Sequence, residues 1–270
     1  MKRSSRTFAL ASLALLAACG KPVAPGESAS TASGNPGSLL ASPKVAPSAQ
    51  VTQPSPNTPS ATPDPSVPIQ RYTDLNALPG GFALSLIVSA KAPAPMAVEE
   101  RLDRLSPTYH SERDVFKRQE IAKTELPRVD AELAKYQKQS YYSLPIANYT
   151  PQALALTNVS VGAYQAASKS FPLMGYGTSC WAGVIRNSQG AVLQLGGGGP
   201  ACSLTVPDEA TARAIESARA NHSLHLDGTA YVFVPQADKG AANGVVAAAH
   251  IVLTEGSQRS PLGRFDLRGS

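Results

Sequence analysis

The strongest constraint on the fold is a low-complexity tract over residues 20–70. It holds eleven of the chain's 23 prolines and no aromatic residue. Its only charged residues are Lys21, Glu27, Lys44 and Asp64. Such a tract cannot bury enough apolar surface to offset the entropy lost on ordering it. We interpret it as a disordered tether, which leaves a single domain over residues 71–270, long enough to bury about 70% of its unfolded surface.

The N-terminus has the features of an export signal. Residues 1–7 carry three basic side chains, and residues 8–16 form an uncharged apolar run. This run has about nine residues, whereas a permanent transmembrane helix needs about twenty. We therefore expect a cleaved signal rather than a membrane-spanning anchor.

The apolar run ends at Leu16-Ala17-Ala18-Cys19, which resembles the lipobox of bacterial lipoproteins. The resemblance implies that residues 1–18 are removed as a lipoprotein signal peptide and that Cys19 is acylated, so that lipid on Cys19 holds the chain on a membrane. Residues 19–70 would then be the lipidated cysteine and its tether. Gly20 stands where lipoproteins retained in the inner membrane typically have Asp, so the family rule favours the outer membrane. The alternative is an ordinary leader with an incidental cysteine.

Net charge gives little reason to expect a nucleic-acid partner. The formal net charge is +5, but Lys2, Arg3 and Arg6 lie in the expected leader, and their loss leaves about +2. A nucleic-acid-binding domain normally carries a stronger basic excess. We predict no nucleic-acid partner.

The first part of the domain is expected to contain a strand and a long helix. The apolar run at residues 82–88 predicts a strand, and the prolines at residues 92–95 predict a break. Ser111 has the features of a helix N-cap, with Asp114 three residues later, for a helix that extends to about Gln139.

That helix is predicted to be amphipathic. Its apolar stripe consists of Ala122, Leu126, Val129, Leu133 and Tyr136. On the other side, Asp114 can pair with Arg118, and Glu132 with Lys135. Pro127 is expected to kink or divide the helix. We expect the stripe to pack on its own domain; the alternative is a helix of another chain.

After residue 151 the pattern is mostly that of strands. Alternation predicts a strand at residues 159–164, and residues 181–185 and 191–195 predict a hairpin through a turn at 187–190. Pro207, Asp208 and Glu209 suit the first turn of a helix that ends near Ala220.

The remaining strands complete the expected fold class. They are predicted at residues 223–226, 229–234 and 245–253, with a turn at Asp227-Gly228 and a loop that ends at Asn243-Gly244. The fold class is therefore α+β: an N-terminal amphipathic helix region followed by a mainly antiparallel β-sheet with one further helix.

With Cys19 assigned to lipid, Cys180 and Cys202 remain as an even pair in an exported chain. They flank the expected hairpin, and closing a loop of about twenty residues is worth roughly 3 kcal/mol. We predict a structural disulfide. The alternative is a reactive thiol at Cys180 with a histidine as base.

Several other residues suggest chemistry only weakly. The four glycines at residues 196–199 precede Pro200 and lack the Lys-Ser/Thr of a phosphate-binding loop, so we expect a flexible connection rather than a phosphate cradle. His222 and His225 are expected to lie on the surface, with a metal site as the alternative. His250 lies in an apolar strand, where a hydrogen-bonded core or interface histidine is expected and a catalytic base is the alternative.

Tyr141, Tyr142 and Tyr149 form the densest aromatic group. They can cover the core beside the long helix or stack on a sugar or peptide, and we favour the first interpretation. No pair of carboxylates can be chosen from sequence spacing. We predict no catalytic residue, no metal site and no cofactor.

Three segments, at residues 78–82, 169–173 and 263–267, are similar to a domain of unknown function in proteobacterial envelope proteins. The resemblance covers most of residues 72–268 and implies no known active site. Together with the lipobox it leads us to expect a membrane-anchored envelope lipoprotein whose domain binds or scaffolds an envelope protein or a glycan. The alternative is an envelope hydrolase that acts on peptidoglycan or on another glycan or peptide.

Overall fold

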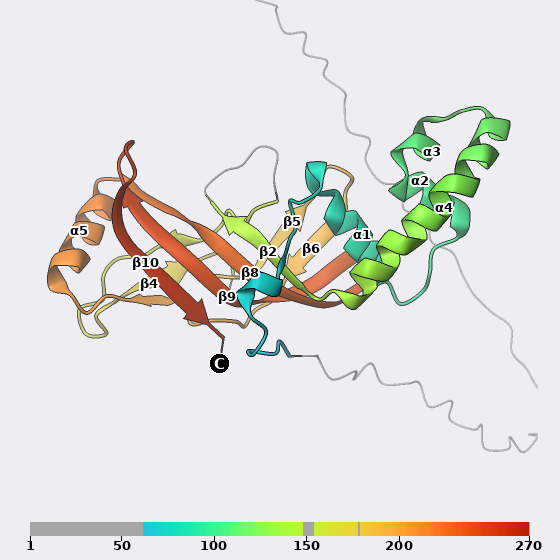
Figure 1. Cartoon of the computed structure of the whole chain (residues 1–270). Helices are drawn as coiled ribbons and strands as arrows, with labels where there is room; N and C mark the ends of the chain where they lie inside the picture. The colour runs from blue at the N-terminus through green and yellow to red at the C-terminus, as the bar shows by residue number, and fades with distance from the viewer. Residues whose placement is uncertain (1–61, 148–153, 178, 270) are drawn as a thin grey trace, which may run out of the picture. The chain divides into compact units, whose positions relative to one another are not determined.

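The computed structural model describes residues 62–147, 154–177 and 179–269 (Figure 1). The predictions for residues 1–61, Cys19 among them, and for Tyr149 lie outside the described residues. The helices are η1 Ile69–Arg71, η2 Pro79–Gly81, α1 Phe82–Ala90, α2 Val98–Leu105, α3 Pro107–Ser111, α4 Val115–Lys138 and α5 Glu209–Ala220. The strands are β1 Thr73–Asp74, β2 Tyr141–Ile146, β3 Ser160–Val161, β4 Ser170–Met174, β5 Gly183–Arg186, β6 Val192–Leu195, β7 Ser203–Thr205, β8 Leu224–Asp238, β9 Ala241–Glu255 and β10 Ser260–Arg268.

The main sheet has seven strands in the order β1-β2-β8-β9-β6-β5, and β10 also pairs with β9. The β1–β2 and β6–β9 pairs are parallel, and the other pairs of this sheet are antiparallel. A smaller sheet has the order β3-β4-β7. Helix α1 packs on β6, β8 and β9, whereas α5 contacts β8, β9 and β10 (Figure 1). The α+β class and the mainly antiparallel sheet are thus confirmed.

Residues 82–88 form a helix instead of the predicted strand. Helix α1 buries six consecutive residues, from Ala83 to Val88, so it is enclosed on all sides and shows no amphipathic period. An apolar run of this length cannot be distinguished from a buried strand by periodicity alone. Gly80 and Gly81 adopt positive φ just before the helix and turn the chain into it.

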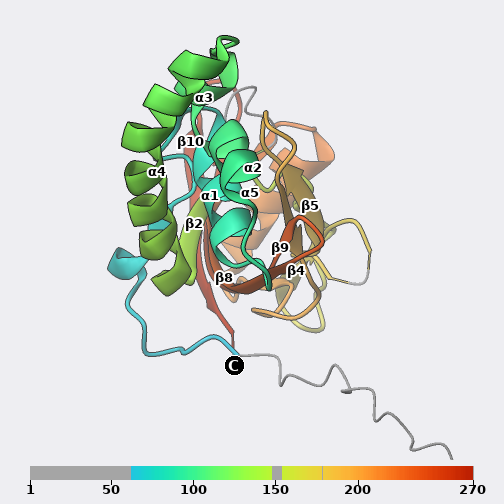
Figure 2. The same cartoon turned by 90° about the vertical axis from the view of Figure 1, so that its right-hand side faces the viewer.

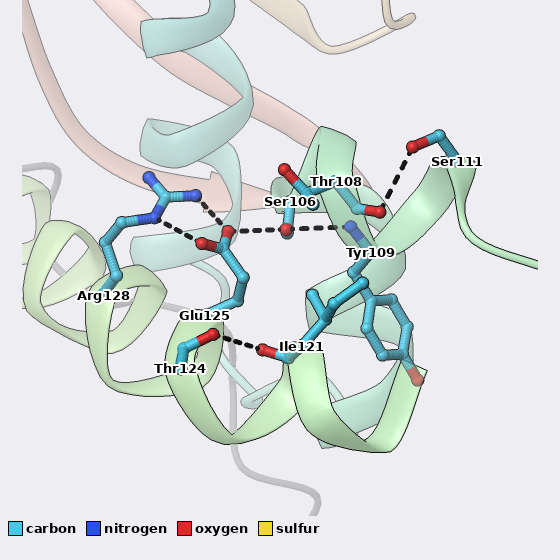
Figure 3. A network of polar contacts seen from close by, with 8 residues as sticks. All are labelled: Ser106, Thr108, Tyr109, Ser111, Ile121, Thr124, Glu125 and Arg128. Carbon is cyan, nitrogen blue, oxygen red and sulfur yellow. Dashed lines mark hydrogen bonds and ion pairs between the residues drawn. The ribbon is translucent and has the colours of Figure 1, made fainter. Parts of the chain in front are cut away.

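The helical region contains two short helices that the sequence pattern did not predict. Ser111, expected as an N-cap, instead ends α3, and Asp114 caps α4 by accepting hydrogen bonds from the N–H groups of Phe116 and Lys117. Ser106 is the N-cap of α3 and accepts from the N–H of Tyr109 at 3.2 Å. Its hydroxyl also donates to Glu125 of α4 at 2.6 Å, which ties the two helices together (Figure 3).

Helix α4 confirms the predicted amphipathic pattern. Val129 and Tyr136 are buried, and the rest of the stripe packs partly buried against the same core. Figure 2 shows α1, α2 and α4 side by side, so the stripe covers neighbouring helices of its own domain. Pro127 lies within a continuous helix and does not divide it. Pro127 is exposed, so water can hydrogen-bond to the carbonyl group four residues earlier, which proline leaves without an N–H donor.

One of the two predicted ion pairs on α4 forms, and the other does not. Glu132 and Lys135 lie 3.8 Å apart, as expected. Arg118 reaches Asp103 of α2 at 3.5 Å, while Asp114 is used as the helix cap. The Asp114 carboxylate caps the helix instead of pairing with Arg118, because the first N–H groups of a helix have no partner inside it.

Strands β8 and β9 are longer than predicted and form one extended hairpin. Asp227 and Gly228, expected as a turn, lie inside β8, and Asn243 and Gly244 lie inside β9. A side chain at Gly228 would overlap the main chain of His250, so this glycine allows close approach within the sheet. The actual turn is the pair Lys239-Gly240, both at positive φ, as a two-residue hairpin requires.

The predicted β5–β6 hairpin and the helix after Asp208 are confirmed. Gly183 pairs with Leu195 and Arg186 with Val192 around the expected turn. Asp208 is the N-cap of α5 and accepts from the N–H of Thr211, so Pro207 lies one residue before the cap and not in the first turn. The predicted strand at residues 159–164 is reduced to β3.

Cys180 and Cys202 are joined at disulfide distance, with sulfur atoms 2.11 Å apart, as predicted. Trp181 beside them is fully buried and donates from its indole nitrogen to the carbonyl of Pro200 at 2.8 Å. The disulfide loop is therefore fixed to the core. Among the described residues, no helix is both long and apolar enough to cross a membrane.

Candidate binding groove

The main sheet bends where its two longest strands change register. Beyond Tyr231, the pairing skips Ala247 of β9, and beyond Phe233 it skips Val234 and Pro235 of β8. An extra residue on one strand is a β-bulge, which bends the strand and increases its twist. Proline suits such a position because it has no N–H to donate to a neighbouring strand. The sheet is therefore irregular on both sides of one short stretch.

The edge of β9 is also interrupted at this point. On the edge opposite β8, β6 pairs with residues 241–244 and β10 with residues 248–255. Residues 245–247 have no strand beside them on that edge in the described part of the chain. The carbonyl of Ala247 accepts one hydrogen bond there, from the N–H of Gly269 at 2.9 Å.

A cavity of about 750 Å³ lies over this interruption. Its floor is residues 245–248 of β9, which are all valine or alanine. Its walls are Gly198 and Gly199 of the disulfide loop, Arg268 and Gly269 after β10, and a segment that leads into β1. The wall residues of that segment are Thr62, Pro63, Asp64, Pro65, Val67, Ile69 and Tyr72. We call residues 62–72 the strap.

A second cavity of about 250 Å³ shares Val245 with the first, so the two lie next to each other. It is lined by residues of β6, β8 and β9, among them Gln194, Gln236 and Asn243. We call the two cavities together the bulge groove. Both lie at the irregular stretch. Ala247, which the pairing skips, is in the floor of the first cavity, and Pro235, Gly244 and Val245 line the second.

The strap is held on the sheet by aromatic and polar contacts. The N–H of Asp64 donates to the hydroxyl of Tyr141 at 2.9 Å. Tyr72 makes edge-on contacts with Tyr141 and with Tyr231, each with ring centroids 5.2 Å apart. Residues 64–70, which the sequence assigned to the tether, therefore lie against the domain.

Charge in the bulge groove comes from Asp64 and Arg268. Hydrogen bonds from the hydroxyl and N–H of Ser66 hold the pKa of Asp64 below its ordinary value, so its carboxylate is charged at neutral pH. Arg268 is exposed and has no carboxylate within ion-pair distance among the described residues. Burial raises the pKa of Tyr72, so its hydroxyl stays neutral.

Three side-chain amides of the groove are also free. Gln194, Gln236 and Asn243 make no side-chain hydrogen bond within the part of the chain that the structure describes. A primary amide offers two donors and an acceptor. The groove therefore combines an apolar floor with unused polar groups and one charge of each sign.

The expected core role is confirmed for Tyr142 but not for Tyr141, and Tyr149 lies outside the described residues. Tyr141 lies on the groove side of β2, whereas Tyr142 is fully buried and donates to the carbonyl of Gln139 at 2.9 Å. Adjacent residues of a strand point to opposite faces, which separates the two. The cluster that forms is Tyr72, Tyr141, Tyr231 and Phe233, from three distant segments.

The histidines lie apart from the groove lining. His250 is hydrogen-bonded, with Nδ1 2.7 Å from Oδ1 of Asp266, but it is 35% exposed on the sheet and does not lie in the core. His222 is exposed beyond α5, and His225 lies in β8. The described residues contain no group of three or more metal-ligating side chains.

The remaining predicted positions are structural. Gly199 packs against the carbonyl of Val246, and Gly196 donates to the carbonyl of Gly244 at 2.9 Å, so the glycine run connects β6 closely to β9. Cys180 is part of the disulfide, so the alternative of a free thiol nucleophile there is not supported.

One pair outside the groove resembles a nucleophile with a base. Lys91 at the end of α1 donates to the hydroxyl of Ser140 at 3.1 Å. Burial lowers the pKa of Lys91 from its ordinary value. A lysine with a lowered pKa can act as a general base, but neither residue lines the bulge groove.

Comparison of the chain with family models, with curated proteins and with solved structures found no match in any of the three.

Proposed function

We propose that the chain is an envelope lipoprotein, held on a membrane by lipid on Cys19, whose domain binds a partner in the bulge groove. The anchor rests on the sequence Leu16-Ala17-Ala18-Cys19 and its resemblance to a lipobox. The outer membrane is the proposed site because Gly20 follows the cysteine.

The bulge groove is the observation that supports a binding role. Its floor is apolar, and free polar groups surround it, which is the usual composition of a ligand site. Among its described lining residues the ionisable groups are Asp64, Tyr72 and Arg268. Hydrolysis by paired carboxylates needs two acids across the bond to be cut, whereas this set has one.

The anchor is tested by intact mass and membrane fractionation of the native protein beside Cys19→Ala. We expect the native protein to lack residues 1–18, to carry acyl mass and to fractionate with outer membranes, and the variant to do none of these. A native protein that is unacylated and soluble would refute the anchor.

The binding role is tested with a photo-crosslinking residue placed at Ala248, on the groove floor, or at Val252, on the same face of β9 outside the groove. We expect light-dependent adducts in cells from position 248 and few from position 252. Equal yields at the two positions would show that the groove is not the site of contact.

A second candidate function, an envelope hydrolase, is favoured by the contact between Lys91 and Ser140. In that mechanism neutral Lys91 would accept the proton of the Ser140 hydroxyl as its oxygen adds to a carbonyl carbon, and would return the proton to the leaving group as the bond to that group breaks. Water would then hydrolyse the acyl ester on Ser140. Treatment with a fluorophosphonate, followed by peptide mass analysis, tests this candidate. An adduct on Ser140 that disappears in Lys91→Met would support hydrolysis, and an unmodified Ser140 would remove this candidate.

A further inference from the structure

We propose that the bulge groove takes an extended peptide that carries apolar side chains and an acidic group. This inference rests on the binding role proposed above and names the chemical class of the partner.

The dimensions of the groove suit an extended chain. The two cavities together are lined by residues 243–248 of β9, six consecutive strand residues. At about 3.3 Å per residue this stretch is roughly 20 Å long, which matches about six residues of an extended peptide. A compact ligand would fill the larger cavity and leave the smaller one empty.

The floor suits apolar side chains. Val245, Ala247 and Ala248 are partly exposed on the floor, whereas Val246 is fully buried. Val67 and Ile69 of the strap line the same cavity. Small floor residues leave depth for the side chains of a ligand, and burying each of these side chains contributes about 1.5–3 kcal/mol.

The free amides suit peptide main chain. Each peptide group has one donor and one acceptor, and the side chains of Gln194, Gln236 and Asn243 offer both. All three line the smaller cavity beyond Val245, so they can continue the recognition of a chain that lies over the apolar floor.

The charges of the groove select against a polyanion, and its aromatic residues select against a glycan. Arg268 can pair with a carboxylate, while Asp64 in the same cavity repels a polyanion such as a nucleic acid. A glycan normally stacks on an open aromatic face. Of the two aromatic residues in the lining, Phe233 is only 7% exposed and Tyr72 already contacts two tyrosines edge-on. An otherwise apolar peptide with one acidic residue placed at Arg268 meets these conditions.

The test begins with the full-length acylated chain, immobilised in detergent and exposed to a pool of random heptapeptides with free termini. Retained peptides are sequenced by mass spectrometry and resynthesised with a fluorescent label. We expect enrichment of valine, leucine or isoleucine together with aspartate or glutamate. A pool retained without any sequence preference would overturn the peptide assignment.

Two pairs of variants then locate the site. Arg268→Gln should weaken binding of an acidic peptide about tenfold, which is the loss expected for one charge-assisted hydrogen bond. Arg268→Gln should not change binding of the same peptide when its acidic residue is replaced by the corresponding amide. Arg264→Gln, on the same face of β10 outside the groove, is the matched control and should stay within about twofold. Ala248→Phe should also weaken binding at least about tenfold while Val252→Phe does not, with melting temperatures recorded to confirm folding.

A parallel arm uses chitohexaose and amide hydrogen exchange. Protection of residues 245–248 by peptide but not by chitohexaose is the expected result. Protection by chitohexaose alone would keep the groove as a binding site and overturn the peptide class. Protection by neither probe would overturn both this inference and the proposed groove function.

Discussion

At the residue scale, adjacent glycines of one loop have different roles. Gly198 and Gly199 both have positive φ, at 105° and 94°. A side chain at Gly198 would meet nothing within 4 Å, whereas a side chain at Gly199 would overlap the carbonyl oxygen of Val246. The first glycine therefore provides only a backbone conformation, while the second also allows the loop to contact the groove floor.

This difference predicts unequal effects of alanine. Gly198→Ala should reduce the free energy of unfolding by roughly 1–2 kcal/mol because of its φ alone. Gly199→Ala should cost about 1–3 kcal/mol more, because the new methyl group must displace the β9 main chain. Urea unfolding of the two variants beside the native protein measures both values. Equal reductions in the free energy of unfolding would show that the loop shifts to accept the new methyl group while β9 stays in place.

The disulfide gives a second prediction at single positions. Cys180 and Cys202 are 22 residues apart, and opening a loop of this size should reduce the free energy of unfolding by roughly 3 kcal/mol. Urea unfolding of the native protein with and without a reductant measures the loss. The double variant Cys180→Ser/Cys202→Ser is the control and should not respond to reductant. A native protein whose stability ignores reductant would indicate that the bond does not form.

The sequence predicts the cysteine pair because two of the three cysteines remain once Cys19 is assigned to lipid. It could not identify Arg268 or the amides of the bulge groove. Arg268 and Gln194 lie 74 positions apart, and isolated polar residues of this kind are normal at any protein surface. The only sequence signal near the groove is the run of small residues around Val245, and such a run is equally typical of any buried strand.

At the element scale, one polar network joins α3 to α4 (Figure 3). Arg128 donates to both carboxylate oxygens of Glu125, at 3.2 and 2.5 Å, and Ser106 donates to one of them at 2.6 Å. Ser106 is fully buried and also caps α3. Glu125 therefore connects the start of one helix to the middle of the next.

The network predicts a pH dependence of stability. The bonds from Arg128 and then Ser106 hold the pKa of Glu125 below its ordinary value of 4.5. Because the pKa is lower in the folded state, the carboxylate stabilises the fold above about pH 4.5, and this contribution is lost as the pH falls through the folded pKa. The difference in unfolding free energy between the native protein and Glu125→Gln should thus shrink from pH 7 to pH 3.

The matched control for this experiment is Glu120→Gln, on the same helix. Glu120 pairs with Lys123 at 3.0 Å, but both side chains are more than 70% exposed, and such pairs contribute little. We expect its effect to stay below about 0.5 kcal/mol at each pH. If Glu125→Gln and Glu120→Gln behave alike, the network does not stabilise the junction.

Elements with a clear period could be predicted, and enclosed or bulged elements could not. The apolar stripe of α4 and the β5–β6 hairpin could be predicted from residue spacing because each element has one solvent-exposed face. Helix α1 is buried on all sides, so its residues carry no period. In β8 and β9, Gly228 and Gly244 looked like turn residues, yet each allows a close approach inside the sheet that depends on the partner strand.

At the scale of the whole molecule, the strap belongs by composition to the proline-rich tract and by its contacts to the domain. Asp64 belongs by composition to the proline-rich tract, but it is hydrogen-bonded to Tyr141 of β2, 77 residues away. Composition could not predict this boundary, because the contacts that order the strap come from distant residues. The strap therefore overlaps the end of the proline-rich tract and forms one wall of the groove.

Limited digestion of membranes from expressing cells tests this arrangement together with the proposed anchor. The tract before the strap is rich in proline, serine and alanine, and we expect a protease of broad specificity such as proteinase K to cut there first. The domain should move from the membrane to the supernatant as a fragment that begins near Thr62, because the strap is held on the sheet. For Cys19→Ala the fragment should have the same mass but should be soluble before digestion. A fragment that begins beyond Tyr72 would show that the strap is not held, and the groove would then lack one wall.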